Sequence, residues 1–468
     1  MAEFRAIPSI EQLLQGAAGR ALDARFGREA ATSALRASAA AIRAALAAGA
    51  VVAPDSVPDA ITRHAGAQLL AVARGSLRPV INATGVVIHT NLGRAPLSRL
   101  ALARVAEVGG GYSTLEYDLG TGVRGSRAVH AEHLIVALTG AEAAVVVNNN
   151  AAAVLLMLAA LARGREVLIS RGELVEIGGG FRVPDVMTQS GARLREVGTT
   201  NRTRVSDYTA SAGPATVLIV RVHPSNFRIE GFTERPSLAD LVAVGRACQV
   251  PVAEDLGSGN LDAASSWEPT VQASLAAGVD LVAVSGDKML GGPQAGIVLG
   301  KKALVDRLRI HPLMRALRVD KLTYAALEGT LLDHWAGRAH AEVPVLRMLH
   351  APLDTVRQRA EALAARLTAS GWTAVVADGA SAIGGGSAPG VTVPTALVRI
   401  AWPGWSAERL ESWLRRLDTP VIARIHDDAV VLDLRTVALD DDAGLASLPE
   451  PSAPTSRHAP PPAPGPQT

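Results

Sequence analysis

Residues 281–299 read LVAVSGDKMLGGPQAGIVL, and this stretch decides the fold. The apolar run Leu281–Ser285 has the length and the β-branched content of a buried strand. It delivers Asp287 and Lys288 to its carboxyl end, and a second apolar run, Ala295–Leu299, returns after a turn with paired glycines. Glycines in such a turn let the backbone approach a planar or phosphorylated group closely.

Lys288 is a candidate for amine chemistry. A Walker A loop is excluded, because the residue before its lysine must be glycine. The chain uses arginine for nearly every positive charge, and its 46 basic residues include only four lysines: Lys288, Lys301, Lys302 and Lys321. A solvated lysine in a surface loop remains the alternative.

Asp255 strengthens the case for Lys288. It follows the apolar run Pro251–Glu254 and precedes Lys288 by 33 residues. That separation fits one strand–helix–strand crossover, which places both residues at one edge of a parallel sheet on neighbouring strands. An aspartate there can keep a pyridinium nitrogen protonated. Aspartate beside glycine is also common in turns, so the pairing with Lys288 is what favours a cofactor role.

Three consecutive asparagines, residues 148–150, precede a stretch of small residues that opens a predicted helix. Backbone N–H groups at a helix N-terminus bind phosphate, and we expect Asn149, Asn150 and the hydroxyl of Ser285 to add donors. An asparagine N-cap explains one of the three but not the run. A phosphate cradle, a strand-end aspartate and a strand-end lysine, in this order, predict a fold-type-I enzyme that depends on pyridoxal 5'-phosphate (PLP).

The rest of the chain fits an α/β class. From about residue 78, short Val/Ile-rich runs alternate with helical stretches, which is typical of a mostly parallel sheet covered on both faces. Further strands are predicted at 143–147, 166–169 and 217–222, and helices at 151–161, 238–249 and 271–277.

Four regions are predicted along the chain. Residues 1–74 form a small helical domain with helices at 10–19, 28–48 and 59–73, and residues 75–335 form the large PLP-binding domain. Residues 336–440 form a C-terminal α+β domain, and residues 441–468 a disordered Pro/Ala-rich tail. In the C-terminal domain we expect helices at 353–369 and 407–417, strands at 373–376, 396–401, 421–425 and 429–434, and a Gly/Ser-rich loop at 380–390.

Composition narrows the class of protein. The net charge of +2 excludes a generally polycationic chain, although a local basic patch needs no global excess. The first residues lack the apolar segment of a signal peptide, and no apolar run is long enough to span a bilayer. The single cysteine, Cys248, excludes an internal disulfide. We expect a soluble protein of the cytoplasm.

Several long stretches resemble the bacterial selenocysteine synthases, the L-seryl-tRNA(Sec) selenium transferases. The resemblance extends over about residues 7–437, and the tail lies outside it. The stretches that carry it are Ile7–Leu14, Pro79–Arg94, Gly111–Asp118, Gly198–Arg202, Ser285–Gly296 and His311–Lys321. The stretch 223–227, HPSNF, looks like a mild variant of the family's sequence there.

The resemblance implies roles for individual residues. Lys288 matches the lysine that binds PLP as a Schiff base, and Asp287 matches the acidic residue before it. Arg94, Arg315 and Arg318 match arginines that gather around the anionic selenium donor, and Thr199 and Thr200 match hydroxyl donors in the same pocket. Guanidinium groups suit a phosphate-like anion because they bind its oxygens in pairs. Without the match, Arg315 and Arg318 fit a solvated helix stripe at i, i+3 spacing equally well.

The resemblance also implies a function. The expected reaction converts seryl-tRNA(Sec) to selenocysteinyl-tRNA(Sec) with selenophosphate, through an aminoacrylate intermediate on PLP. Residues 1–74 are the implied tRNA contact, although their eight arginines are balanced by six acids and a packing or dimerisation module has the same pattern. The family assembles as rings of dimers, which implies a homodecamer without a membrane partner.

Two alternatives stay open from the residues themselves. A small-molecule PLP lyase of the same superfamily shares Lys288, Asp255 and the arginines, but it does not need the N-terminal helices. A catalytically silent RNA-binding scaffold does not need the cofactor residues. No cluster in the sequence predicts a metal site.

Overall fold

The computed structural model describes residues 7–49, 53, 56–177 and 180–451. The chain divides into two compact units, one up to Val80 and one from Ile81 onward. Within the described residues, no helix combines the length and apolarity needed to cross a bilayer.

The first unit contains four helices within its described residues: α1 (Ile10–Gln15), α2 (Ala17–Phe26), α3 (Arg28–Ala47) and α4 (Val57–Ala73). Ser9 begins α1 with a capping box to Gln12. The helix predicted at 10–19 is wrong in its extent, because Gly16 takes an extended conformation and separates α1 from α2. Leu35 and Ile61 are fully buried in a core shared by α1, α3 and α4.

The second unit is built on a seven-stranded sheet with the strand order β3–β11–β10–β9–β8–β4–β7. Neighbouring strands are parallel except β11, which is antiparallel to both β10 and β3. The mostly parallel sheet predicted from the sequence is therefore confirmed. Its strands are β3 (Ala143–Val147), β4 (Glu166–Ser170), β7 (Arg193–Val197), β8 (Thr216–Val222), β9 (Val252–Gly257), β10 (Leu281–Ser285) and β11 (Gly296–Gly300).

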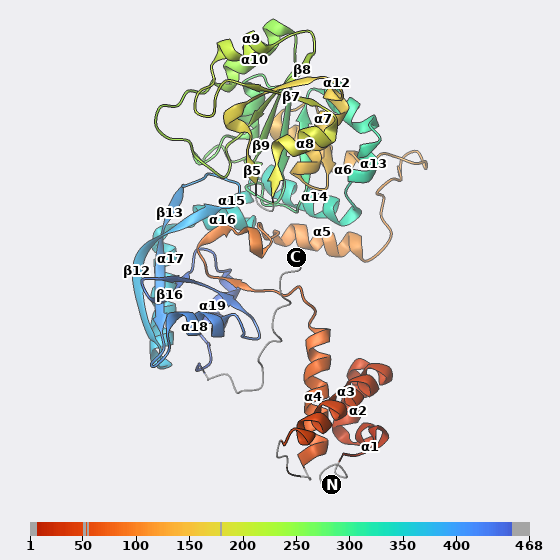
Figure 1. Cartoon of the computed structure of the whole chain (residues 1–468), viewed down its shortest axis with the longest axis vertical. Coiled ribbons are helices and arrows are strands. Elements are labelled where there is room, and N and C mark those ends of the chain that lie inside the picture. The colour runs from red at the N-terminus through yellow and green to blue at the C-terminus, as the bar shows by residue number, and fades with distance from the viewer. Residues whose placement is uncertain (1–6, 50–52, 54–55, 178–179, 452–468) are drawn as a thin grey trace. The chain divides into compact units, whose positions relative to one another are not determined.

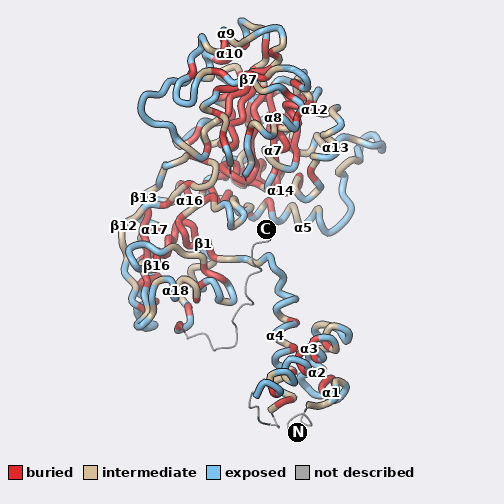
Figure 2. The backbone as a smooth tube through the Cα atoms, viewed as in Figure 1, coloured by how far each residue is buried: buried red, intermediate tan, exposed pale blue. Residues whose placement is uncertain are grey.

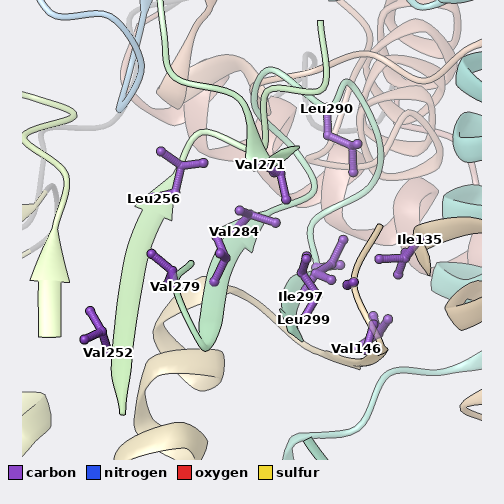
Figure 3. Close-up of a cluster of buried hydrophobic side chains, with 14 of the residues drawn as sticks. Ile135, Val146, Val252, Leu256, Val271, Val279, Val284, Leu290, Ile297 and Leu299 are labelled. Atoms are coloured by element: carbon purple, nitrogen blue, oxygen red, sulfur yellow. The ribbon is translucent and has the colours of Figure 1, made fainter. Parts of the chain in front are cut away.

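Helices cover both faces of this sheet because successive residues of each buried strand point to opposite faces. One core packs the sheet against α6, α10, α11 and α14, and Figure 3 shows part of it, with Val252 and Leu256 on β9 and Val284 on β10. The opposite core packs it against α7, α8 and α12. Figure 2 shows buried residues concentrated in the strands of this sheet.

The helices of this region are α5 (Arg99–Gly109), α6 (Val129–Thr139), α7 (Asn150–Ala162), α8 (Val183–Ser190), α9 (Val205–Ser211), α10 (Leu238–Cys248), α11 (Val271–Ala276), α12 (Lys302–Ile310), α13 (Leu313–Leu317), α14 (Lys321–Trp335), α15 (Ala339–Glu342) and α16 (Pro344–His350). Two short strands, β5 (Glu176–Ile177) and β6 (Phe181–Arg182), pair with each other. Single 3-10 turns occur at η3 (Thr90–Leu92), η4 (Arg171–Glu173) and η5 (Leu439–Asp441).

A second sheet, in the order β15–β16–β13–β12–β2, follows toward the C-terminus of the same unit. Its strands are β2 (Val86–Ile88), β12 (Thr373–Gly384), β13 (Thr392–Ala401), β15 (Arg424–His426) and β16 (Ala429–Asp433), and β1 (Ile81–Asn82) pairs separately with β14 (Val421–Ile422). The helices α17 (Leu353–Ala369) and α18 (Ala407–Leu414) contact this sheet (Figure 1).

Two C-terminal expectations need correction. The loop predicted from residue 380 begins later, because β12 continues to Gly384, where Ala382 and Gly384 pair with β2. The tail predicted from residue 441 also begins later, because α19 (Asp442–Leu445) follows η5 and buries Leu445 and Leu448 in the C-terminal core. Residues 452–468 of that expected tail lie outside the described residues.

Candidate active site

The carboxyl ends of the parallel strands bring polar side chains to one edge of the large sheet. Strand β9 lies between β8 and β10, with Asp255 opposite Val222 on one side and Ala283 on the other. The crossover through α11 connects β9 to β10, as the spacing of Asp255 and Lys288 predicted. Parallel α/β sheets bind ligands at this edge.

Lys288 lies in the turn after β10 and is only 8% exposed. Its Nζ donates a hydrogen bond to the carbonyl oxygen of Gly386, at 3.2 Å. Burial lowers the pKa of Lys288; the carboxylate of Asp255 opposes this shift, and the guanidinium of Arg94 adds to it. More of this amine is therefore neutral at physiological pH than in a solvated lysine, and the neutral form is the nucleophile.

Asp255 lies inside β9 and not after it, because the strand continues to Gly257. Its Oδ1 accepts a hydrogen bond from Asn150 Nδ2 at 2.7 Å. Burial raises the pKa of Asp255, while the hydrogen bond from Asn150 and the charge of Lys288 lower it. A carboxylate this deeply buried is stabilised by a cationic partner, and a protonated ring nitrogen is one.

The side chains of Asn149 and Asn150, at the start of α7, have hydrogen-bond partners within the chain. Asn149 is the N-cap, and its Oδ1 accepts a hydrogen bond from Ala152 N at 2.9 Å. The side-chain nitrogen of Asn150 is engaged with Asp255. Backbone N–H groups at the start of α7 suit a phosphate, and donation to it from the side chains of Asn149 and Asn150 stays a prediction. The buried Oδ1 of Asn150 has no hydrogen-bond partner in the chain.

Ser285, Asp287 and Arg94 form a hydrogen-bonded chain beside Lys288. Ser285 Oγ donates to Asp287 Oδ1 at 2.6 Å, and Arg94 Nη1 lies 2.7 Å from Asp287 Oδ2. The Ser285 hydroxyl is thus directed at Asp287 in the single chain, and its expected donation to a phosphate stays a prediction. Arg94 itself has a φ of 62°, in the left-handed region that a non-glycine residue adopts at a cost.

Arg315 and Arg318 lie elsewhere in the chain. They line a depression of about 500 Å³ together with Arg124 and Arg127. Glu116 also lines it: its Oε1 is 3.5 Å from Arg318 Nη1, and the hydrogen bond from Arg127 lowers its pKa. This depression, rich in arginine, suits an anion, but within one chain no contact joins its arginines to Arg94.

Thr199 and Thr200 lie in the loop after β7. Thr199 Oγ1 donates to the carbonyl oxygen of Arg202 at 2.9 Å. Thr200 lines a pocket of about 370 Å³ that His223 and Glu268 also line. The backbone N–H of His223 donates to the carbonyl oxygen of Asp255 at 2.9 Å, so this pocket adjoins the site of Asp255, whereas Arg315 and Arg318 line a separate depression.

Three further residues lie next to Lys288 and Asp255, and no role was predicted for any of them individually from the sequence. His223 follows β8, and its Nε2 lies 2.9 Å from Oε2 of the buried Glu268. The other oxygen of Glu268 accepts a hydrogen bond from Ala388 N. His223 follows an apolar strand and could have been found by that signal, whereas Glu268 and Gly386 lie in long loops without a pattern.

Comparison with protein families gives two matches. The model of the L-seryl-tRNA selenium transferase family matches residues 80–438, and a model described as selenocysteine synthase N terminal matches residues 4–43.

Individual relatives agree with these matches. An L-seryl-tRNA(Sec) selenium transferase of Geobacter sulfurreducens is 49% identical over 95% of this chain and 97% of its own. The enzyme of that name from Moorella thermoacetica is 48% identical over 85% of this chain and 86% of its own. Among solved structures, a D-glucosaminate-6-phosphate ammonia-lyase has a similar fold, with a TM-score of 0.54 at 20% identity, covering 81% of this chain and 95% of that one.

Proposed function

The chain belongs to the L-seryl-tRNA selenium transferase family, and we propose from this that it converts seryl-tRNA(Sec) to selenocysteinyl-tRNA(Sec), with PLP held at Lys288 and selenophosphate as the selenium donor. The single observation that carries the assignment to this site is that buried Lys288, in the turn after β10, interacts with the charge of buried Asp255 on the neighbouring strand β9.

The residues at this edge fit PLP. The fit rests on a buried amine, a buried carboxylate and the N-terminus of α7, which match the aldehyde, the ring nitrogen and the phosphate of the cofactor. The buried and unpartnered Oδ1 of Asn150 is a further sign that a polar group belongs beside Asp255. When bound, PLP supplies a conjugated ring that delocalises the electron pair left at the α-carbon of the amino acid.

Lys288 moves the protons in this proposal. Its lowered pKa makes the neutral amine more accessible than in a solvated lysine, and neutral Nζ can accept the α-proton of the serine and later return a proton to the same carbon. Asp255 would hold the protonated ring nitrogen of PLP. The carbonyl oxygen of Gly386 orients Nζ of Lys288. Burial of all these groups excludes water from the proton transfer.

Arg94 is the residue proposed to bind the selenium donor. Its side chain is one-third exposed, so an anion can reach the guanidinium. The ion pair with Asp287 fixes the orientation of the guanidinium before the anion binds. Selenophosphate carries the paired oxygens that a guanidinium binds. Arg315 and Arg318 are proposed for the same anion, and Thr199 and Thr200 as hydroxyl donors to it; no contact within one chain joins these four residues to Lys288. Their proposed role therefore requires a second copy of the chain or a rearrangement.

The test is a turnover assay with seryl-tRNA(Sec) and selenophosphate, in which the esterified amino acid is identified by mass. Lys288→Ala should lower the rate at least about a hundredfold and lose the PLP that borohydride fixes to the wild-type chain. Lys302→Ala is the matched control, because Lys302 pairs with Asp306 on the surface of α12. If serine stays unchanged on the tRNA while wild-type protein still binds PLP, a small-molecule lyase replaces the proposal.

A further inference from the structure

Two histidines and an aspartate meet outside the candidate active site. Asp262 lies in the loop after β9, His340 in α15, and His350 at the end of α16. Asp262 Oδ2 is 3.2 Å from His340 Nε2 and 2.7 Å from His350 Nε2. The imidazole rings are stacked with their centroids 4.2 Å apart. The described residues hold no other such group of three or more histidine, cysteine or carboxylate side chains.

The three side chains present the ligand atoms that a zinc ion prefers. Two imidazole nitrogens and one carboxylate oxygen lie within 4.8 Å of one another. Tetrahedral zinc with bonds of about 2.0–2.2 Å holds its ligand atoms roughly 3.3–3.6 Å apart. The separation of 3.2 Å to His340 nearly meets that range, and the separation of 2.7 Å to His350 needs to open by less than an ångström.

Asp262 is held in place by groups that leave its Oδ2 free for the histidines. Its Oδ1 accepts a hydrogen bond from Ala264 N at 3.0 Å. Its backbone N–H donates to Asn260 Oδ1, also at 3.0 Å. Asp262 is buried, so its oxygen is fixed before any ion arrives. Outer contacts of this kind orient metal ligands and strengthen binding.

The geometry of the group leaves an ion a way in. Both imidazoles direct Nε2 at the same carboxylate oxygen, so the three ligand atoms face one another. The side chain of His340 is about half exposed, which gives an ion access and leaves room for a water as fourth ligand.

We propose that Asp262, His340 and His350 form a binding site for one zinc ion per chain. The ion would tie the loop after β9 to α15 and α16. That loop also carries Trp267, whose ring centroid is 5.2 Å from that of His350, and Glu268, which contacts His223. Zinc binding would therefore hold Glu268 in place at the edge of the active site.

The experiment uses the full-length holoenzyme without a histidine tag, cleared of metal with a chelator and kept at about pH 8, where free imidazole is neutral. Cobalt(II) is the probe, because its visible absorption reports four-coordinate binding, and the zinc bound per chain is then counted by mass spectrometry. We expect one equivalent of metal per chain. His340→Gln should weaken cobalt binding at least about tenfold.

His133→Gln is the matched control, since His133 is an exposed histidine on α6 that lies outside the group. Its cobalt titration should match the wild type. Asp262→Asn removes the charge and keeps the shape, and it should weaken binding as His340→Gln does. Binding below one equivalent at high cobalt, or the same titration for His340→Gln and wild type, would overturn the proposal. Neither result would contradict the proposed selenium transferase activity, because the zinc site contributes no residue to that reaction.

Discussion

The amine of Lys288 is surrounded by charges of both signs, and their balance decides at which pH it reacts. Burial and Arg94 lower its pKa, whereas Asp255 and Asp287 raise it. Arg94 also pairs with Asp287, so one guanidinium acts on the lysine directly and through the carboxylate that it neutralises.

Replacing Arg94 should therefore shift the pH dependence of cofactor capture. In Arg94→Gln the pKa of Lys288 rises, because a nearby cation is lost and Asp287 is no longer neutralised. The amine then becomes neutral only at higher pH. We expect the rate at which cofactor-free protein takes up PLP to reach half its maximum at a higher pH than in the wild type, measured by absorbance in a pH series.

Arg99→Gln provides the control for that measurement. Arg99 is an exposed arginine whose nearest carboxylate, on Asp440, is 4.0 Å away. Its profile should overlay the wild type. A profile for Arg94→Gln that kept its midpoint and only lost amplitude would show that Arg94 acts through structure and not through charge.

At the scale of elements, the loop that follows β12 completes the lysine site. Gly386 accepts the hydrogen bond from Lys288, and its φ is +77°. A methyl group at this position would lie 2.6 Å from Lys288 Nζ and 3.0 Å from its Cε. The lysine would have to leave its position to make room.

Gly386→Ala should therefore impair PLP retention more than it impairs folding. Gly404→Ala is a matched control, since Gly404 has a φ of +76° and nothing within 4 Å of an added methyl group. Both variants should lose about 1 kcal/mol of stability or somewhat more to backbone strain. Only Gly386→Ala should lose PLP on gel filtration, and equal retention by the two variants would contradict a role for this contact.

The sequence predicted the elements whose side chains alternate between buried faces. β3 and β10 begin and end where the apolar runs do, because both strands are buried on two faces and contain no polar residue before their ends. β7 was missed because it lies at the sheet edge, where RLREV needs no apolar side chains. The strand predicted at 373–376 ended too early, because the Gly- and Ser-rich end of β12 forms a strand only through pairing with β2.

In the candidate active site, too, some contacts could be predicted from the sequence and others could not. Lys288 and Asp255 could be related from the sequence because one crossover separates their strands, and a crossover has a predictable length. The contacts of Gly386 and Glu268 depend on long loops that fold back from other elements, and no local pattern encodes them. The proposed zinc ligands were missed for a similar reason, because they lie on three separate elements.

At the scale of the whole molecule, the role expected for the first unit, tRNA binding, is inferred mainly from the resemblance to the family and least from its own residues. A compact unit up to Val80 precedes the unit that holds Lys288 and Asp255. Within it, Arg28 is paired with Glu11 and Asp23, so part of its positive charge is already neutralised. Charge alone does not distinguish a tRNA-binding unit from a packing module.

Removal of residues 1–80 distinguishes a tRNA-binding unit from a packing module. The remaining chain should bind PLP like the full chain, because every contact of Lys288 described above lies beyond residue 80. The KM for seryl-tRNA(Sec) should rise at least about tenfold, equivalent to about 1.4 kcal/mol of lost binding. An unchanged KM, with fewer chains per particle by light scattering than in the full-length protein, would instead make residues 1–80 an assembly module.

The strand pairing at the start of the second unit has a consequence for biosynthesis. β1 and β2 are made early, but they pair with β14 and β12, which leave the ribosome only near the end of translation. At roughly 5–20 residues per second the nascent chain waits on the order of tens of seconds with these partners missing. Lys288 likewise lacks its contact with Gly386 until a further 98 residues have been synthesised. Closure of the second sheet and completion of the lysine site therefore both wait for the C-terminal part of the chain. A translation product that ended before residue 385 would contain Lys288 without the loop that carries Gly386.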